Sequence, residues 1–135
     1  MDISLSQCFV IVTDPDAALA FYRDTLGLEV RNDVARGSLR WITVGCDSQP
    51  GVSIVLTNYL NGSPADNETV AGLVAKGALN GVHFSTDDLD ALFARVEKAG
   101  ADIVSEPTEQ PWGTRDFAVR DPAGNLIRID QPPAR

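Results

Sequence analysis

The amino-acid sequence predicts an α+β protein made of two βαβββ modules. Two observations carry this prediction: an internal repeat, and the same order of expected strands and helix in both halves of the chain. The repeat keeps a constant offset of 73 residues over five landmarks. It pairs Leu19 with Leu92, Gly27 with Gly100, Val30 with Ile103, Gly51 with Gly124 and Leu56 with Ile129. Since self-similarity at a fixed offset marks a repeated structural unit, both halves are expected to fold alike.

The first module begins with an apolar segment over residues 7–12, which predicts a strand. Thr13 or Asp14 can cap a helix over residues 16–25, because a short polar side chain can accept a hydrogen bond from the first free N–H groups. Apolar residues recur at helical spacing along it, and Gly27 ends it. Three further strands are predicted over residues 28–34, 39–44 and 52–57.

The second module repeats this order. A strand is predicted over residues 81–86, and Asp87 or Asp88 can cap a helix that ends near residue 99. Three strands follow, over residues 102–105, 115–120 and 126–130. We expect one domain over residues 1–135, with module one at 5–57, a linker at 58–79 and module two at 80–131. The linker is expected to hold one helical turn around residues 70–75.

Charge and cysteine content narrow the classes of partner. The chain has 11 Lys and Arg against 19 Asp and Glu, a net charge of −8. A surface this acidic repels nucleic acid and anionic membranes. Neither is therefore expected as a partner. The N-terminus lacks a basic segment and a long apolar run, which favours a cytoplasmic protein. Cys8 and Cys46 are expected to be reduced thiols, because two cysteines make no disulfide framework.

Strand alternation separates the expected side chains into two faces. One face is uniformly apolar and should pack under the helices: Cys8, Val10, Val12, Ile54, Leu56, Val82, Phe84, Ile127 and Ile129. The other mixes apolar, hydroxyl and charged groups: Gln7, Phe9, Ile11, Ser53, Val55, Thr57, Gly81, His83, Ser85, Leu126, Arg128 and Asp130. This mixture is typical of a ligand cleft, and the alternative is a hydrated sheet face with some apolar residues left exposed.

Two motifs carry a family resemblance. The opening motif joins Val12 and Asp14 to Phe21-Tyr22 and Leu26-Gly27-Leu28, and the closing run over residues 111–125 reads PWGTRDFAVRDPAGN. With these motifs the chain resembles the vicinal oxygen chelate superfamily of glyoxalases, bleomycin resistance proteins and extradiol dioxygenases, over residues 5–131. The closing run is similar to the bleomycin-resistance branch. The resemblance implies an eight-stranded curved mixed sheet around a cleft, with helices on the convex side, and a homodimer that is often module-swapped.

The resemblance also implies where the metal ligands of related enzymes would fall. They fall on Gln7, Val55, Gly81 (or Asn80 if the register slips by one) and Arg128. Val and Gly offer no donor atoms, and a guanidinium repels a divalent cation. A catalytic site needs three or more protein ligands, so we expect no metal and no cofactor.

The candidate ligand-binding residues are Gln7, Phe9, Trp41, Ser53, Val55, Tyr59, His83, Trp112, Arg115 and Arg128. Trp41 and Trp112 offer flat stacking surfaces, although Trp41 can equally fill the core. Arg115 can bind ligand oxygens, or pair with Asp116 or Glu109. Tyr59, at the start of the linker, can close the cleft.

The sequence therefore predicts a protein that sequesters a small aromatic or cationic organic ligand, such as an antibiotic. A metal-independent isomerase or lyase using His83 as its base is the first alternative, and a glyoxalase- or dioxygenase-type metalloenzyme is the second. Binding is expected rather than catalysis. The identity of the ligand, the role of His83, and whether modules pair within or between chains stay open.

Overall fold

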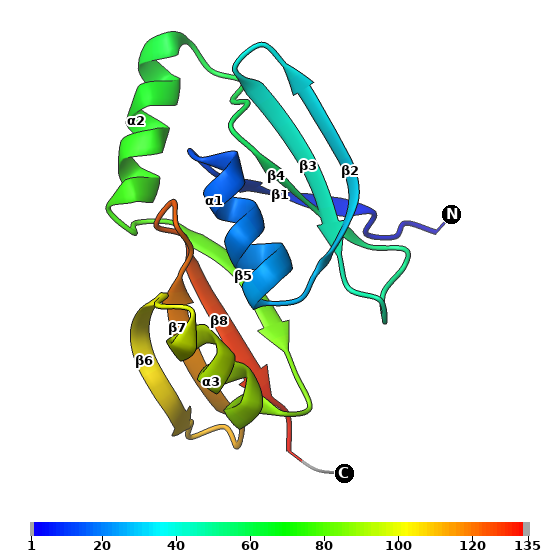
Figure 1. Ribbon diagram of the computed structural model, residues 1–135, viewed down its shortest axis with the longest axis vertical. Coiled ribbons are helices and arrows are strands. Elements are labelled where there is room, and N and C mark those ends of the chain that lie inside the picture. Colours follow the sequence, from blue (N-terminus) through cyan, green and yellow to red (C-terminus); the bar gives the residue numbers. More distant parts are fainter. Residues whose placement is uncertain (1, 134–135) are drawn as a thin grey trace. The chain divides into compact units, whose positions relative to one another are not determined.

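The computed structural model describes residues 2–133 and divides the chain into two compact units (Figure 1). The first is Met1–Gly72 and the second is Leu73–Arg135. Each contains a four-stranded mixed sheet with a helix between its first and second strands. The α+β prediction with two βαβββ modules is confirmed, and the eight strands form two four-stranded sheets.

The first sheet has the strand order β1-β4-β3-β2. Its strands are β1 (Gln7–Ile11), β2 (Glu29–Arg36), β3 (Leu39–Gly45) and β4 (Ser53–Thr57). Strand β1 pairs with β4 in parallel, and β4, β3 and β2 pair antiparallel. The helical segment carries the chain from β1 at one edge of the sheet to β2 at the other edge. Strand β3 then pairs with β2, and β4 lies between β3 and β1, so the first and last strands of the module are neighbours.

The helical segment of the first unit begins as α1 (Pro15–Leu19) and continues as a π-helical segment, η1 (Ala20–Thr25). Asp14 is its cap, because the Asp14 Oδ1 atom accepts a hydrogen bond from the Ala17 N–H at 3.1 Å. The consecutive residues Phe21 and Tyr22 are both buried, and their ring centroids lie 4.9 Å apart. The π segment thus delivers two adjacent aromatic rings to the core.

The covered side of the first sheet is apolar, as predicted. Its buried residues are Val10, Val12, Ile42, Val44, Ile54 and Leu56. Cys8 departs from the prediction, because it is exposed rather than packed under the helix. It lies near the start of the edge strand β1, and burial on that strand begins only at Val10.

The second sheet has the order β5-β8-β7-β6. Its strands are β5 (Asn80–Ser85), β6 (Asp102–Glu109), β7 (Arg115–Arg120) and β8 (Leu126–Gln131), with helix α3 (Leu89–Lys98) after β5. Asp88 caps α3 by accepting a hydrogen bond from the Ala91 N–H at 3.1 Å. The core includes a T-shaped contact between Phe93 of α3 and Phe117 of β7.

The segment between the modules holds a longer helix than the sequence predicted. Helix α2 spans Pro64–Ala75, whereas a single turn around residues 70–75 was expected. Its apolar residues do not gather on one face, so periodicity did not reveal it. A start signal was present, since Ser63 and Asp66 exchange backbone-to-side-chain hydrogen bonds at 3.4 and 3.2 Å.

The repeat is visible in the strand bounds. Strands β1, β2 and β4 each start 73 residues before β5, β6 and β8. The two units differ in the turn between their second and third strands. Gly37 and Ser38 join β2 to β3, whereas residues 110–114 join β6 to β7. Trp112 lies in this longer loop, so it has no counterpart in the first unit.

Candidate functional site

Alternation and strand register bring a defined set of side chains to the side of the first sheet opposite its apolar core, here called the open face. One row crosses the sheet through Ile11, Thr57, Trp41 and Val34, and the next through Phe9, Val55, Thr43 and Asn32. The pairing of β2, β3 and β4 places Trp41 between Val34 and Thr57. The open face is therefore a product of the fold.

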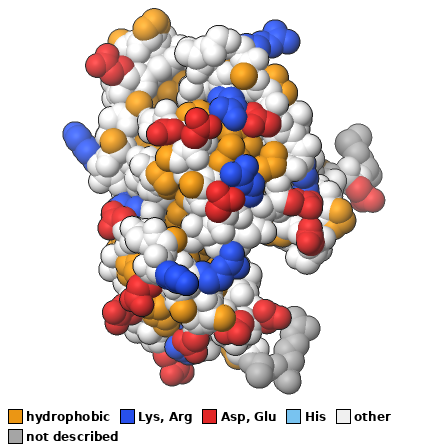
Figure 2. Space-filling view, in the orientation of Figure 1, with side chains coloured by type: hydrophobic (Ala, Val, Ile, Leu, Met, Phe, Trp, Pro, Cys, Tyr) orange, Lys and Arg blue, Asp and Glu red, His pale blue; other side chains and the backbone are white. Residues whose placement is uncertain are grey.

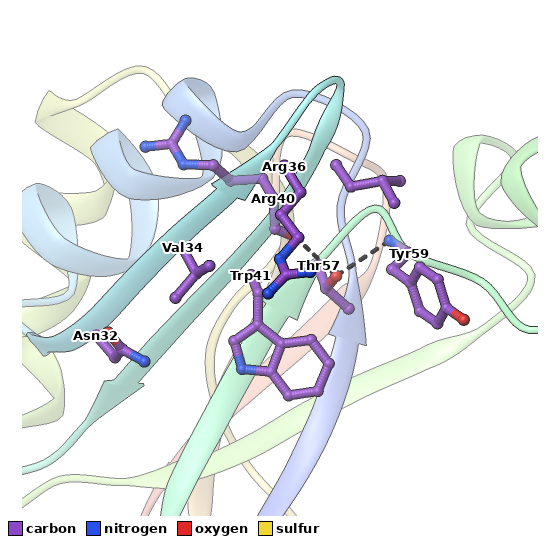
Figure 3. A pocket seen from close by; sticks show the side chains of 8 residues that line it. Asn32, Val34, Arg36, Arg40, Trp41, Thr57 and Tyr59 are labelled. Carbon is purple, nitrogen blue, oxygen red and sulfur yellow. Dashed lines mark hydrogen bonds between the residues drawn. The ribbon is translucent and has the colours of Figure 1, made fainter.

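A cavity of about 410 Å³ lies on this face, at the end of the sheet near the β2–β3 turn (Figure 3). Its lining residues are Asn32, Val34, Arg36, Leu39, Arg40, Trp41, Thr57 and Tyr59. Trp41 and Tyr59 lie on either side of Thr57 and provide its aromatic walls. All of these residues belong to the first unit, so the cavity is complete within it.

Phe9 and Trp41 form an aromatic pair beside this cavity. Their ring centroids are 5.3 Å apart and their planes meet at 75°, an edge-to-face arrangement. Val55 and Thr57 lie on the strand between them and are buried, at 0% and 3% exposure. Val55, a predicted ligand-binding residue, is buried and is not among the residues that line the cavity. Phe9 is 56% exposed, so its outer side is accessible.

The two arginines of the cavity are electrostatically different. Arg40 donates from Nε and Nη2 to the Asp33 carboxylate at 2.6 and 2.8 Å, and its Nη1 lies 3.5 Å from Asp16. The hydrogen bonds with Asp33 raise the pKa of Arg40 and lower the pKa of Asp33. In Figure 3 Arg36 extends over the sheet toward Trp41 and Thr57, while Arg40 extends the other way.

The opposite end of the open face is closed by Arg31. Strand β2 has a register irregularity there, and the Arg31 guanidinium crosses β3 to donate to Ser53 Oγ at 2.9 Å and to the Val52 carbonyl at 2.6 Å. A Cβ atom at Gly45 would overlap the guanidinium, so a side chain there would displace Arg31 from this position. Gln7 pairs with Ser53 in the register, so these two predicted residues lie at the Arg31 end and outside the cavity.

The corresponding face of the second sheet carries a polar cluster. His83 Nε2 lies 3.2 Å from Asp130 Oδ2, and Ser85 Oγ donates to Asp130 Oδ1 at 2.5 Å. The parallel register places these groups together, pairing His83 with Arg128 and Ser85 with Asp130. The structure thus places the Asp130 carboxylate beside the His83 imidazole.

Arg128 is held by a buried carboxylate in the same cluster. Asp116 is 2% exposed and accepts from Arg128 Nη1 at 3.2 Å and from Gln110 Nε2 at 2.9 Å. The guanidinium is thus compensated by a carboxylate on the neighbouring strand β7. Arg128 is one of the positions to which the family resemblance assigned a metal ligand, and a paired guanidinium cannot serve as one.

Two predicted residues of the second unit do not join this cluster. Arg115 pairs with Asp90 of α3 at 3.1 Å, on the helix-covered side of the sheet, rather than with Asp116 or Glu109. Trp112 is 70% exposed in the β6–β7 loop. The part of the chain that the structure describes contains no group of three His, Cys, Asp or Glu side chains able to hold a metal ion.

Sequence reasoning missed five residues of the cavity, namely Asn32, Val34, Arg36, Leu39 and Arg40. The signal was alternation along β2, which puts Asn32, Val34 and Arg36 on one face. The predicted strand ended at Val34, two residues before its actual end, so Arg36 was left in a turn. Trp41 and Tyr59 were among the predicted ligand-binding residues, and both line the cavity.

Comparisons with known proteins agree with this architecture. The model of the Glyoxalase/Bleomycin resistance protein/Dioxygenase superfamily matches residues 4–129. The uncharacterized protein YurT of Bacillus subtilis (strain 168) is 36% identical over 124 residues, covering 90% of this chain and 94% of YurT.

Two crystal structures are similar along nearly the whole chain. UcmS2 superposes with a TM-score of 0.84 at 34% identity, covering 96% of this chain and 98% of UcmS2. TnmS3, described as an antibiotic binding protein from Streptomyces sp. CB03234, gives 0.75 at 31% identity, covering 98% and 99%. Together with the family match, these relationships show that the chain belongs to the glyoxalase/bleomycin resistance protein/dioxygenase superfamily.

Proposed function

We propose that this protein binds and sequesters a small aromatic organic molecule, such as an antibiotic, in the cavity between Trp41 and Tyr59. The observation that carries the proposal is the cavity itself, about 410 Å³ with aromatic and aliphatic walls and a few polar groups. Small-molecule sites are typically of ~300–1,000 Å³ and have this composition. The similarity to TnmS3, an antibiotic binding protein, supports the same class of function.

We also propose that the protein is a cytoplasmic homodimer. It binds its ligand without catalysing a reaction and without a metal or cofactor. The residues at the family's metal positions support this, since Val55 and Gly81 offer no donor atoms and Arg128 is a cation paired with Asp116. No helix among residues 2–133 is long and apolar enough to cross a membrane. Elemental analysis of the purified protein tests the metal-free proposal, and a stoichiometric transition metal contradicts it.

Isothermal titration calorimetry against glycopeptide, enediyne and quinone antibiotics tests the binding proposal. We expect saturable binding of at least one planar aromatic compound. Trp41→Leu should weaken that binding by at least about fivefold, because stacking of a flat ring on an aromatic side chain contributes ~1–3 kcal/mol. Trp112→Leu measures whether the exposed loop contributes as well. The absence of measurable binding for every compound of the panel at high ligand concentration contradicts the proposal.

The pairing of His83 with Asp130 favours one second candidate, a metal-independent isomerase or lyase. A carboxylate 3.2 Å from the imidazole can orient it as a general base. In that case His83→Ala abolishes turnover of a bound ligand and leaves its affinity nearly intact. A bound ligand that is recovered chemically unchanged after long incubation with the wild-type protein counts against catalysis.

A further inference from the structure

We propose that the cavity of the first unit selects planar aromatic ligands that carry a negatively charged oxygen group, and that Arg36 is the residue that binds this group. The inference rests on the proposed function and narrows it to one ligand class. The sequence had left aromatic and cationic ligands as equal expectations. The charges around the cavity favour an anionic group over a cationic one.

Arg36 is the cation available to a ligand. It belongs to the last pair of the β2–β3 ladder, opposite Leu39, and its side chain extends over the sheet toward Trp41 and Thr57 (Figure 3). Within residues 2–133, no carboxylate forms an ion pair with its guanidinium. A planar guanidinium offers several N–H donors in a fixed fork, which suits a carboxylate, a phenolate or a sulfonate.

The other charges near the cavity do not cancel this one. Arg40 is already compensated by Asp33 and Asp16. Asp33 is held by Arg40 on the other side of the sheet, as alternation along β2 requires. No Asp or Glu is among the described residues that line the cavity. A cationic ligand would therefore meet the Arg36 charge with no acidic partner.

The remaining lining groups suit the aromatic body of such a ligand. Thr57 Oγ1 donates to the Arg40 carbonyl at 2.7 Å and accepts from the Tyr59 N–H at 3.0 Å, so this hydroxyl is largely used within the protein. Val34 and Leu39 are 41% exposed each, and Tyr59 is 48% exposed. An apolar ring gains stability by covering these surfaces, while its charged edge reaches Arg36.

The net charge of −8 does not contradict the local preference. Charges beyond a Debye length of ~8 Å at physiological salt are largely screened, so the nearest groups dominate. Acidic and basic side chains are also interspersed over the visible surface rather than segregated (Figure 2). The anion preference should consequently weaken at high salt, whereas the stacking contribution should not.

Three probes with the same ring system test the inference: 2-anthracenecarboxylate, 2-anthracenecarboxamide and 2-(aminomethyl)anthracene. Their affinities for the wild-type protein are measured by calorimetry. We expect the carboxylate to bind about tenfold more tightly than the neutral amide, and the cation to bind most weakly, since charge-assisted hydrogen bonds are the strong ones. Arg36→Gln should reduce the carboxylate preference to less than about twofold, because the charged donor of the cavity is lost.

Arg23→Gln is the matched control, because Arg23 is an exposed arginine of the same unit that pairs with Asp24 away from the cavity. It should behave as the wild type. Equal affinities for all three probes, or the tightest binding for the cation, overturn the anion preference and leave the aromatic site standing. A wild-type protein that binds none of the three overturns this inference and counts against the proposed function as well.

Discussion

At the scale of single residues, each charged group on the first sheet has a distinct role set by its neighbours. Arg31 donates hydrogen bonds to backbone carbonyl groups and to Ser53, and Arg40 forms an ion pair with Asp33. Arg36 is left facing the cavity. Three arginines of one hairpin therefore differ in function because of their partners, although their chemistry is the same.

The Asp33–Arg40 pair gives a pH-dependent prediction. The hydrogen bonds from Arg40 lower the pKa of Asp33, so the pair stabilises the folded state above the ordinary Asp pKa of ~3.9 and that contribution is lost as pH falls through the lowered value. Asp33→Asn should lower the melting temperature at pH 7 by no more than a few degrees, because the pair is partly solvated. The difference from wild type should disappear once the pH is below the lowered pKa of Asp33. Thermal melts across pH measure this, with Glu68→Gln on α2 as control; a difference independent of pH contradicts it.

At the scale of elements, local signals were sufficient where one feature decides the structure. Asp14 and Asp88 cap helices as expected, and the bounds of β7 were predicted without error. Helix α2 was predicted only as a single turn around residues 70–75, because its apolar residues do not share one face. The pairing of His83 with Asp130 depends on the parallel register of β5 and β8, which the sequence does not state directly.

The C-terminal end of α2 depends on a glycine in the β7–β8 turn. Gly124 has φ +111°, and a Cβ atom there would collide with the Val74 carbonyl. Gly124→Ala should lower the free energy of unfolding by about 2 kcal/mol through backbone strain and this overlap. Gly72→Ala is the control, because Gly72 lies within α2 with open space around it and alanine should stabilise the helix by about 1 kcal/mol. Urea denaturation compares the two; equal effects of the two substitutions contradict this account.

At the scale of the whole molecule, two copies of one module have diverged to carry different chemistry. The open face of the first is aromatic, with Phe9, Trp41 and Tyr59, while the second holds the polar cluster of His83, Asp130 and Arg128. The motifs and the repeat were enough to predict the family and its fold. They could not predict this division, because it depends on which side chains meet across strands.

Large apolar side chains are exposed on both units, including Phe9, Val34 and Val104. Association of two chains would stabilise the protein by covering such apolar side chains. We expect sedimentation equilibrium to give twice the chain mass of 14.5 kDa. A mass of one chain at a protein concentration of tens of micromolar would contradict the proposed homodimer.

The most direct test of the aromatic cavity uses the fact that the chain has only two tryptophans. Trp112→Phe leaves Trp41 as the sole tryptophan, so its emission reports on the cavity wall alone. Titration of this variant with an aromatic ligand that calorimetry has identified should quench Trp41 emission along the same saturation curve as the heat signal. Saturable binding that leaves Trp41 emission unchanged would place the ligand elsewhere and contradict the account.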